Sequence, residues 1–368
     1  MKMIKNKTTL IIDGNWLMMS RFGAMQDQFS SEYNENTLQA ASNELVDLLA
    51  QSVNKIINFF GDNIDNIIMV QDGGSWRKHI RKPKLYKEDY KGNRIKDEGT
   101  SWDYVWKSLS RFCENFKEVG ISCFREDDCE GDDWCWYWSK TLNKNGINAI
   151  VWTSDRDLQQ LVSYNRNKTW TVWYNDKKGL VCHRDLQKKE DLLEDMLSLD
   201  MGNPTFDSLK SYMDGLFVDV NFINPMDVAM EKVICGDSGD NIKSIMRVEK
   251  NGRIARISEK EWDSVKESYE DFKDLEDFKS TAKDIILDLK ELKRFTENKD
   301  SMKDLYQMFL FNMRLVCLDT KYIPKKIRDV MNKHKEEYLQ ADMENILNNY
   351  KVLAPSDDVE VEDLFDIF

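Results

Sequence analysis

The sequence predicts an α/β fold: a mostly parallel sheet flanked by helices, followed by a smaller helical domain. Short apolar runs alternate with helical stretches from residue 8 to about residue 182, an order typical of βαβ units. From about residue 185 the sequence becomes polar and helical and is almost free of strand signals. With 368 residues, of which 41% are hydrophobic, the chain is long enough for one large or two modest domains.

Each expected element follows from a local pattern. Apolar runs predict strands at 10–12, 67–70, 121–124 and 149–152, and helical spacing predicts helices over 37–60, 102–119 and 132–142. On the third helix, Trp134, Trp136 and Trp138 are expected to be core residues rather than cofactor contacts. Turn residues between 170–174 and 180–182 predict a hairpin or an edge pair. Farther along, 259–300 predicts solvent-facing helices and 302–318 a buried helix, with a break at Pro324.

Seven acidic residues stand where the predicted strands end, in four clusters. Asp13 and Asp72 follow the first two strands, Asp155 and Asp157 follow the fourth, and the third strand is followed by Glu130, Asp132 and Asp133. The carboxyl ends of parallel strands form the ligand crevice of an open α/β sheet, so these carboxylates should converge.

Converging carboxylates repel one another unless cations neutralise them. Oxygen ligands with hardly any His or Cys nearby favour Mg²⁺ or Mn²⁺ over zinc. Two such ions can clamp a phosphodiester for hydrolysis. The sequence therefore predicts a metal-dependent phosphodiesterase site.

Overall composition restricts the class of protein. No apolar run approaches the length of a membrane span, and no signal-peptide core precedes the first strand, so we expect a cytoplasmic protein without membrane contacts. The seven cysteines lack C-x-x-C spacing, and we expect reduced, mostly buried thiols. A net charge of -13 by itself argues against a nucleic-acid partner.

The distribution of charge reverses that argument. Residues 77–96 carry nine basic and two acidic side chains, and Trp76, Tyr86 and Tyr90 are interleaved with them. This pattern suits phosphate contacts combined with base stacking. The alternative is a solvated basic helix, although Pro83 argues against an uninterrupted one.

Five motifs occur in order along the chain: Ile11-Ile12-Asp13-Gly14, the block from Asp72 through Trp76-Arg77 to Tyr90-Lys91-Gly92-Asn93-Arg94, Glu130-Gly131-Asp132-Asp133, Thr153-Ser154-Asp155-Arg156-Asp157-Leu158, and Gly236-Asp237-Ser238-Gly239-Asp240-Asn241-Ile242. In these motifs the chain resembles the flap-endonuclease-like 5′ nucleases, most closely the ribonuclease H enzymes of T-even-type phages. The resemblance covers nearly the whole chain. It implies a PIN-like sheet domain and a helix-three-turn-helix-like element that grips duplex nucleic acid.

The resemblance also implies roles for individual residues. One metal site would use Asp13, Asp72, Glu130, Asp132 and Asp133, and a second would use Asp155, Asp157, Asp237 and Asp240. Lys91 and Arg94 would stand at the base of an arch, residues 77–98, and stabilise charge on the scissile phosphate, with Arg77 beside the metals. The remaining nucleic-acid contacts would be Arg81, Lys82, Lys84, Tyr86, Lys87, Tyr90, Asn241 and Lys243.

The segment 236–242 can also be interpreted from the spacing of its own residues. Asp237 and Asp240 are three residues apart, so on one helical turn they would face the same way; alternatively Asp237 caps a helix. The usual Pro-Gly-Val and Gly-Ile-Gly pattern of the family is replaced here by Lys243-Ser244-Ile245-Met246-Arg247-Val248 and a later Gly252.

The last residues form a separate motif. After a polar stretch at 355–358, the chain ends with Leu364, Phe365, Ile367 and Phe368. These resemble the C-terminal peptides by which phage polymerases engage a sliding clamp; the alternative is a tail that packs on its own domain. The predicted division is a nuclease domain at 1–185, a helical domain at 186–345, and a linker and tail at 346–368.

Together these observations predict a monomeric 5′-3′ exonuclease and flap endonuclease with two Mg²⁺ ions, replaceable by Mn²⁺. Its substrates would be RNA primers, RNA-DNA hybrids and DNA 5′ ends or flaps in phage replication, and a single-strand-binding protein would use the helical domain. Two alternatives remain: a PIN-type ribonuclease in RNA processing, and a non-catalytic, structure-selective DNA-binding protein.

Overall fold

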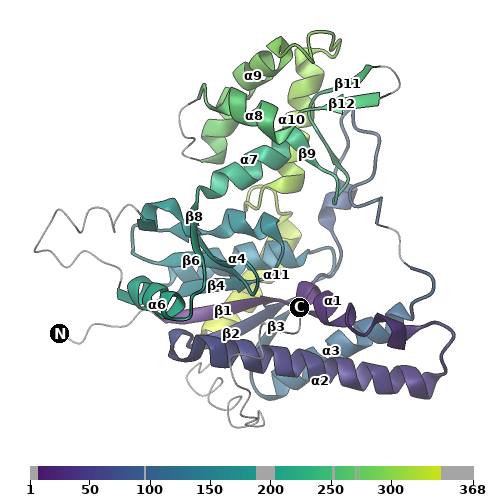
Figure 1. Ribbon diagram of the computed structural model, residues 1–368, viewed down its shortest axis with the longest axis vertical. Coiled ribbons are helices and arrows are strands. Elements are labelled where there is room, and N and C mark those ends of the chain that lie inside the picture. The colour runs from purple at the N-terminus through teal and green to yellow at the C-terminus, as the bar shows by residue number, and fades with distance from the viewer. Residues whose placement is uncertain are drawn as a thin grey trace, which may run out of the picture. The chain divides into compact units, whose positions relative to one another are not determined.

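The computed structural model describes residues 7–94, 97–187, 204–250, 253–269, 272 and 274–340 (Figure 1). These residues form two compact units. Unit 1 draws on 1–74, 97–222 and 325–368, and unit 2 on 75–96 and 223–324. The division differs from the boundary predicted at residue 185, because the described part of 186–222 packs with the sheet and the basic segment groups with the helical unit. The predicted tail lies outside the described residues.

Unit 1 is built on a sheet with the strand order β3-β2-β1-β4-β6-β7-β8, and β5 pairs with β6. β1, β2, β3, β4 and β6 are parallel, whereas β5 and β7 run antiparallel to β6. The predicted fold class and hairpin are confirmed. The strands are β1 Thr8–Asp13, β2 Asn66–Val70, β3 Ser122–Phe124, β4 Asn148–Trp152, β5 Ser163–Tyr164, β6 Trp170–Asn175, β7 Gly179–His183 and β8 Val220–Ile223.

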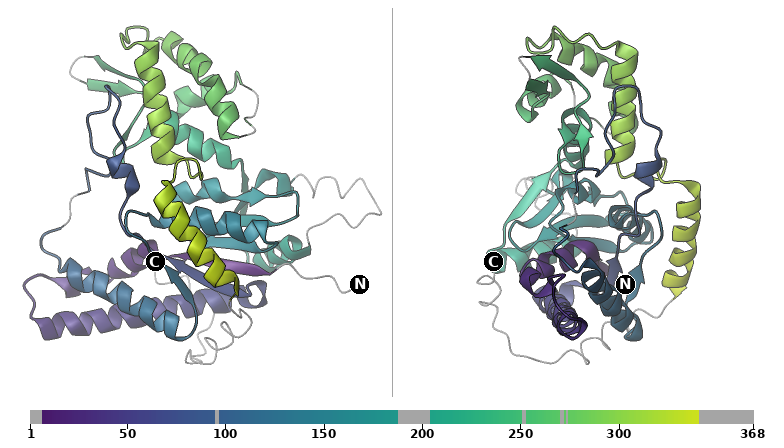
Figure 2. Two further views of the ribbon diagram at one scale, coloured as in Figure 1. Left: turned by 180° about the vertical axis from the view of Figure 1, so that it is seen from behind. Right: turned by 90° about the vertical axis from the view of Figure 1, so that its right-hand side faces the viewer.

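Helices cover both faces of this sheet: α2 and α3 lie on one face, α4 and α11 on the other (Figures 1 and 2). Trp134 and Trp138 of α4 are fully buried, as predicted, and Trp136 is half-buried. The three helices predicted for this region are confirmed within a few residues. The elements are α1 Gly14–Phe22, α2 Glu35–Phe60, α3 Trp102–Glu118, α4 Gly131–Lys144, α6 Pro204–Gly215, α11 Lys325–Gln340, and the 3₁₀ helices η1 Gln26–Phe29, η2 Gly61–Asn63 and η4 Arg156–Leu161.

Unit 2 is mainly helical, with α10 as the predicted buried helix. α8 and α9 bury only one side, for example Trp262 and Phe278. The expectation of almost no strands beyond residue 185 is wrong, because the structure contains β8 to β12 there. These strands are so short that no alternation of apolar and polar side chains marks them in the sequence. The elements are η3 Trp76–His79, α7 Pro225–Cys235, β9 Gly236–Asp237, β10 Ile242–Lys243, β11 Arg247–Lys250, β12 Arg253–Arg256, α8 Glu259–Lys266, α9 Leu275–Glu291 and α10 Met302–Val316.

Two predictions from composition can be checked here. The cysteines are free thiols, and all are buried except Cys123, which is half-buried. Among the described residues, no helix combines the length and apolarity that crossing a membrane requires.

Candidate active site

The predicted crevice is at the point where strand order reverses. β2 and β3 extend the sheet on one side of β1, while β4 and β6 extend it on the other. In doubly wound sheets, ligands bind outside the carboxyl ends of the strands at this point. Asp13 is the last residue of β1, Asp72 follows the end of β2, and Asp155 follows the end of β4. The strand pattern thus delivers carboxylates from three neighbouring strands to one edge.

Asp13 is held firmly in a buried position. Its Oδ1 accepts a hydrogen bond from the Trp16 amide at 3.0 Å, which caps α1, and its Oδ2 accepts one from Thr153 Oγ1 at 2.9 Å. The pKa of Asp13 is raised to about 7, chiefly by burial; the charges of Asp72 and Asp155 act in the same direction, and the two hydrogen bonds oppose it. The ionised carboxylate is therefore costly without a cation beside it.

Asp72 is positioned by backbone contacts that sequence reasoning missed. Its amide donates to Asn15 Oδ1 at 2.9 Å, and its Oδ1 accepts from the Gly131 amide at 2.6 Å. A Cβ on Gly131 would lie 3.1 Å from that same oxygen. A Cβ on Gly73 would lie 1.9 Å from the Glu126 carbonyl oxygen. Gly73 and Gly131 thus allow the loop after β2 to approach the loop before α4 closely. The signal in the sequence was that one glycine follows Asp72 and the other follows Glu130.

The N-terminus of α4 carries the third acidic cluster. Glu130 is the N-cap residue and forms a capping box with Asp133, and both are buried. Asp132, half-buried, lies between them in the first turn. The helix dipole and the first amides favour negative charge there. Glu130 and Asp133 therefore have a structural role in starting the helix, in addition to the metal role predicted for them.

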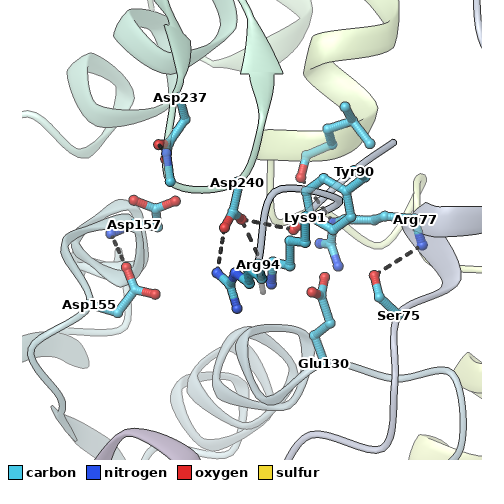
Figure 3. A network of polar contacts seen from close by, with 12 residues as sticks. Ser75, Arg77, Tyr90, Lys91, Arg94, Glu130, Asp155, Asp157, Asp237 and Asp240 are labelled. Atoms are coloured by element: carbon cyan, nitrogen blue, oxygen red, sulfur yellow. Dashed lines mark hydrogen bonds and ion pairs between the residues drawn. The ribbon is translucent and has the colours of Figure 1, made fainter. Parts of the chain in front are cut away.

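Asp155 closes the cluster from the other side of β1. Its amide donates to Thr153 Oγ1 at 3.0 Å, and Thr153 in turn donates to Asp13. Its Oδ1 accepts from the Asp157 amide at 2.8 Å, which caps η4 (Figure 3). Thr153 thus fixes the spacing between the carboxylates that end β1 and follow β4.

A buried thiol on α4 is affected by the same acids. Burial raises the pKa of Cys135 on α4, and the charges of four carboxylates add to this effect: Asp13, Asp132, Asp155 and Asp72. One sulfur therefore lies within the field of acids from β1, α4 and the loops after β4 and β2. Within the described ranges, no group of three or more His, Cys, Asp or Glu side chains is arranged so that it could hold a metal ion.

Unit 2 holds the other two predicted metal ligands, in a different setting. Gly236–Asp237 pairs with Ile242–Lys243 in a tight hairpin, so the prediction that Asp237 and Asp240 share a helical turn is wrong; the backbone turns back instead of coiling. Asp237 accepts from Lys232 Nζ at 2.6 Å and from the Gly239 amide at 2.8 Å. Burial opposes ionisation, but the Lys232 hydrogen bond and charge hold the pKa of Asp237 below its usual value.

Asp240 binds the cations predicted at the arch base. Its Oδ1 accepts from Arg94 Nη2 at 2.5 Å, its Oδ2 accepts from Tyr90 Oη at 3.0 Å, and Lys91 Nζ lies 3.7 Å from that Oδ2 (Figure 3). The Lys91 amide also donates to the Asp240 carbonyl at 2.8 Å. The structure therefore places the two predicted catalytic cations together, on a shared carboxylate.

Further hydrogen bonds tie the basic segment to the hairpin. Asn241 Nδ2 donates to the Asp89 carbonyl at 2.9 Å, and Tyr86 Oη donates to the Asn241 carbonyl at 2.7 Å. Lys91 and Asn241 both adopt positive φ, at 54° and 58°. These contacts make the end of the segment a fixed loop.

The two tyrosines of the segment are not the stacking platforms that the sequence suggested. Tyr86 is 3% exposed and packs edge-on against Phe311 of α10 with ring centroids 4.7 Å apart, and Tyr90 is 6% exposed. Their rings serve as anchors within unit 2. The alternative of a solvated basic helix is also wrong, since residues 80–94 form turns after η3.

The other basic residues divide into buried and exposed groups. Arg77 is 3% exposed, and its Nε donates to the Leu315 carbonyl at 2.9 Å. Arg81 and Lys87 are exposed, as the arch prediction requires. Lys82 pairs with Asp89, Lys84 lies 3.9 Å from Asp304, and Lys243 donates to Asn241.

Comparison with known proteins places these features in context. Residues 8–192 match the family model of the 5′-3′ exonuclease N-terminal resolvase-like domain. A 5′-3′ exonuclease of Buchnera aphidicola is 29% identical over 192 residues, which are 51% of this chain and 59% of that protein. A 5′-3′ exonuclease of Mycoplasmopsis pulmonis is 24% identical over 366 residues, covering 96% of this chain and 97% of that protein.

Solved structures show the same fold. The bacteriophage T5 5′-exonuclease, solved with bound divalent zinc ions, superposes with a TM-score of 0.53 at 16% identity. The match covers 91% of this chain and 99% of the phage chain. A second T5 structure, co-crystallised with metal ions, gives the same values.

Proposed function

Because the chain belongs to the 5′-3′ exonuclease family, we propose that it is a divalent-metal-dependent 5′ nuclease. The observation that carries the proposal is the linked set of carboxylates at the carboxyl ends of the strands: Asp13 and Asp155 are both hydrogen-bonded through Thr153, and Asp72 accepts from the Gly131 amide at the start of α4. Its substrates are DNA and RNA-DNA hybrids with 5′ ends or flaps, including RNA primers. The setting is DNA replication in the cytoplasm. For a phage-encoded enzyme, this is the cytoplasm of the bacterial host.

The donor set fits Mg²⁺, with Mn²⁺ as a substitute. Mg²⁺ keeps several waters and is bound through one or two carboxylates rather than a closed protein cage, which agrees with spaced, mutually repelling acids. When bound, such ions polarise the phosphodiester and neutralise developing charge. Asp13, Asp72, Asp132 and Asp155 would hold them, with Glu130, Asp133 and Asp157 supporting from the N-termini of α4 and η4.

The chain's own cations have a separate task. Lys91 and Arg94, oriented by Asp240, would stabilise charge on the scissile phosphate. Arg81, Lys82, Lys84 and Lys87 would guide the single-stranded 5′ end, and Asn241 and Lys243 would contact duplex backbone. Arg77 would stiffen the segment through Leu315.

A direct assay tests the proposal. End-labelled flap, nicked duplex and RNA-DNA hybrid substrates should be cleaved from the 5′ side with Mg²⁺ and left intact with chelator. Asp155→Asn should lower the rate by at least about a hundredfold, since it deletes ligand charge. Asp47→Asn, an exposed acid in the middle of α2, is the matched control. Metal-independent cleavage, or normal rates in Asp155→Asn, would contradict the assignment.

Partner binding through the chain end is part of the same proposal. The apolar residues Leu364, Phe365, Ile367 and Phe368 would dock on a sliding clamp, and the helical unit would engage a single-strand-binding protein, with the enzyme itself monomeric. Deleting residues 361–368 should leave cleavage of short substrates unchanged and abolish clamp binding measured by calorimetry. Equal clamp affinity with and without the tail would refute this part.

A further inference from the structure

One buried side chain of α10 closes the base of the β9–β10 hairpin. Asn312 is fully buried, and its Nδ2 donates to the carbonyl oxygen of Val233 on α7 and to that of Lys243 on β10, both at 2.8 Å. Val233 precedes the hairpin, and Lys243 is its last residue. The amide group therefore bridges the chain that enters the hairpin and the chain that leaves it.

The orientation of this amide group is determined by its two partners. Both are carbonyl oxygens, which only accept hydrogen bonds, so the nitrogen of Asn312 must face them. The oxygen, Oδ1, is buried and has no hydrogen-bond partner in the described part of the chain. An unpaired buried acceptor destabilises a fold, and an apolar side chain of similar size would avoid that cost. The two donated hydrogen bonds are thus what distinguishes asparagine from leucine at this position.

The hairpin that Asn312 closes carries the carboxylate of the arch base. Asp240 lies in the turn between β9 and β10; its Oδ1 accepts from Arg94 Nη2, and its Oδ2 lies 3.7 Å from Lys91 Nζ (Figure 3). The Asp240 carbonyl also accepts from the Lys91 amide. A change in the direction of the hairpin would therefore move both cations with it.

The same turn of α10 also contacts the basic segment. The ring of Phe311 packs against Tyr86, and the Leu315 carbonyl accepts from Arg77 Nε. Three residues within one helical turn thus hold both partners of the arch base: Phe311 and Leu315 hold the basic segment, and Asn312 holds the hairpin. Helix α10 is their common support.

We propose that Asn312 is a positioning residue for the two cations of the arch base, Lys91 and Arg94. It acts through the hairpin, by setting the direction in which Asp240 presents its carboxylate to them. The role of the cations at the scissile phosphate rests on the proposed nuclease function. The mechanical link from Asn312 to the basic segment does not.

Hydrogen exchange of the full chain, without metal or substrate, tests that link. Asn312→Leu removes both donated hydrogen bonds at similar volume, while the Ile245 amide still donates to the Ile234 carbonyl at 3.1 Å, so the fold should persist. Amides in 89–94 and 236–243 should exchange at least about threefold faster, and those of α9 at the wild-type rate. Unchanged exchange in both segments would overturn the proposal.

Two further variants support this measurement. Met308→Leu, a buried change one turn earlier on α10 that removes no hydrogen bond, is the control and should leave both segments unchanged. Asn312→Asp keeps the shape of the side chain and, protonated by burial, donates only one of the two hydrogen bonds. It should accelerate exchange in the same two segments and provides the test if Asn312→Leu does not fold.

Single-turnover cleavage of a flap substrate with Mg²⁺ tests the functional part. Asn312→Leu should lower turnover at least about tenfold, with substrate affinity in chelator within about twofold of the wild type. In a Lys91→Ala background the same substitution should lower turnover only about threefold or less, because one of the cations that it positions is gone. An equal loss in both backgrounds, or a loss of affinity that matches the loss of turnover, would overturn the proposal.

The two measurements also separate this proposal from the proposed function. If the wild type cleaved no substrate while Asn312→Leu still accelerated exchange in 89–94, the nuclease function would be refuted and the link from Asn312 to the basic segment supported.

Discussion

The two units compensate the charges of their carboxylates in opposite ways. In unit 1, the burial of Asp13 and the nearby Asp72 and Asp155 raise its pKa to about 7. In unit 2, Asp237 is paired with Lys232 and its pKa is lowered, and Asp240 is bound by Arg94 and Lys91. In unit 1, the neighbouring acids therefore add to the cost of ionising Asp13. In unit 2, lysine and arginine side chains offset the charges of Asp237 and Asp240.

This difference identifies which carboxylates require an added cation for their stability. Acids that raise each other's pKa gain most from a divalent ion. Acids already paired with Lys or Arg must break those pairs to become ligands, which costs free energy. We therefore expect the unit 1 cluster to dominate metal affinity, and Asp240 to act first as the residue that positions Lys91 and Arg94.

A large effect on turnover should come from removing a positioned cation. Lys91→Ala should lower turnover about a hundredfold with little change in substrate affinity, because its charge would act mainly in the transition state. The measurement is single-turnover cleavage alongside binding in chelator. The double variant Lys82→Ala with Lys84→Ala should instead weaken binding and flatten its salt dependence. Interchangeable defects would mean that the two groups of lysines share one role.

Asp13→Asn should separate activity from stability. The amide oxygen can still accept from the Trp16 amide, and the amide nitrogen, in the place of Oδ2, can donate to Thr153 Oγ1, while the unfavourable charge is removed. A carboxyl group whose folded pKa is raised destabilises the fold at pH values above its unfolded pKa. In chelator at about pH 8, unfolding by denaturant should therefore cost on the order of 2 kcal/mol more than in the wild type. Cleavage should be lost. If the variant were instead less stable than the wild type, the charge of Asp13 would already be neutralised in the folded protein.

Asp240→Asn should have the opposite sign. Losing the ion pairs to Arg94 and Lys91 should lower the free energy of unfolding by about 1 kcal/mol. The dependence of cleavage on metal concentration sharpens the comparison. A midpoint close to that of the wild type, with reduced turnover, would support the positioning role; a large rise in the midpoint would make Asp240 a dominant ligand.

The smallest effect is expected at a close backbone approach. Gly131→Ala places a methyl group 3.1 Å from Asp72 Oδ1, so we expect a loss of activity of about threefold to tenfold with a normal fold. Gly215→Ala, with nothing within 4 Å of its added Cβ, is the control. Equal rates in both variants would show that Asp72 can move without consequence.

The local pattern was sufficient for much of unit 1. Apolar runs ending in Asp13 and before Asp72 and Asp155 predicted both the strands and the edge at which the carboxylates lie. The long amphipathic spacing of 37–60 likewise predicted α2. These features depend on residues close together in the chain, where side-chain periodicity and the alternation of strands and helices suffice.

Other features depended on contacts between distant residues. Tyr86 is buried because Phe311 lies against it, and Asp240 has cationic partners because the chain from 89 to 94 folds onto the β9–β10 hairpin. The grouping of 75–96 with 223–324 follows from the same contacts. The sequence by itself determined which residues carry charge and where strands end. Only the tertiary structure decided which charges meet, because partners such as Arg94 and Asp240 are 146 residues apart and local periodicity says nothing about such pairs.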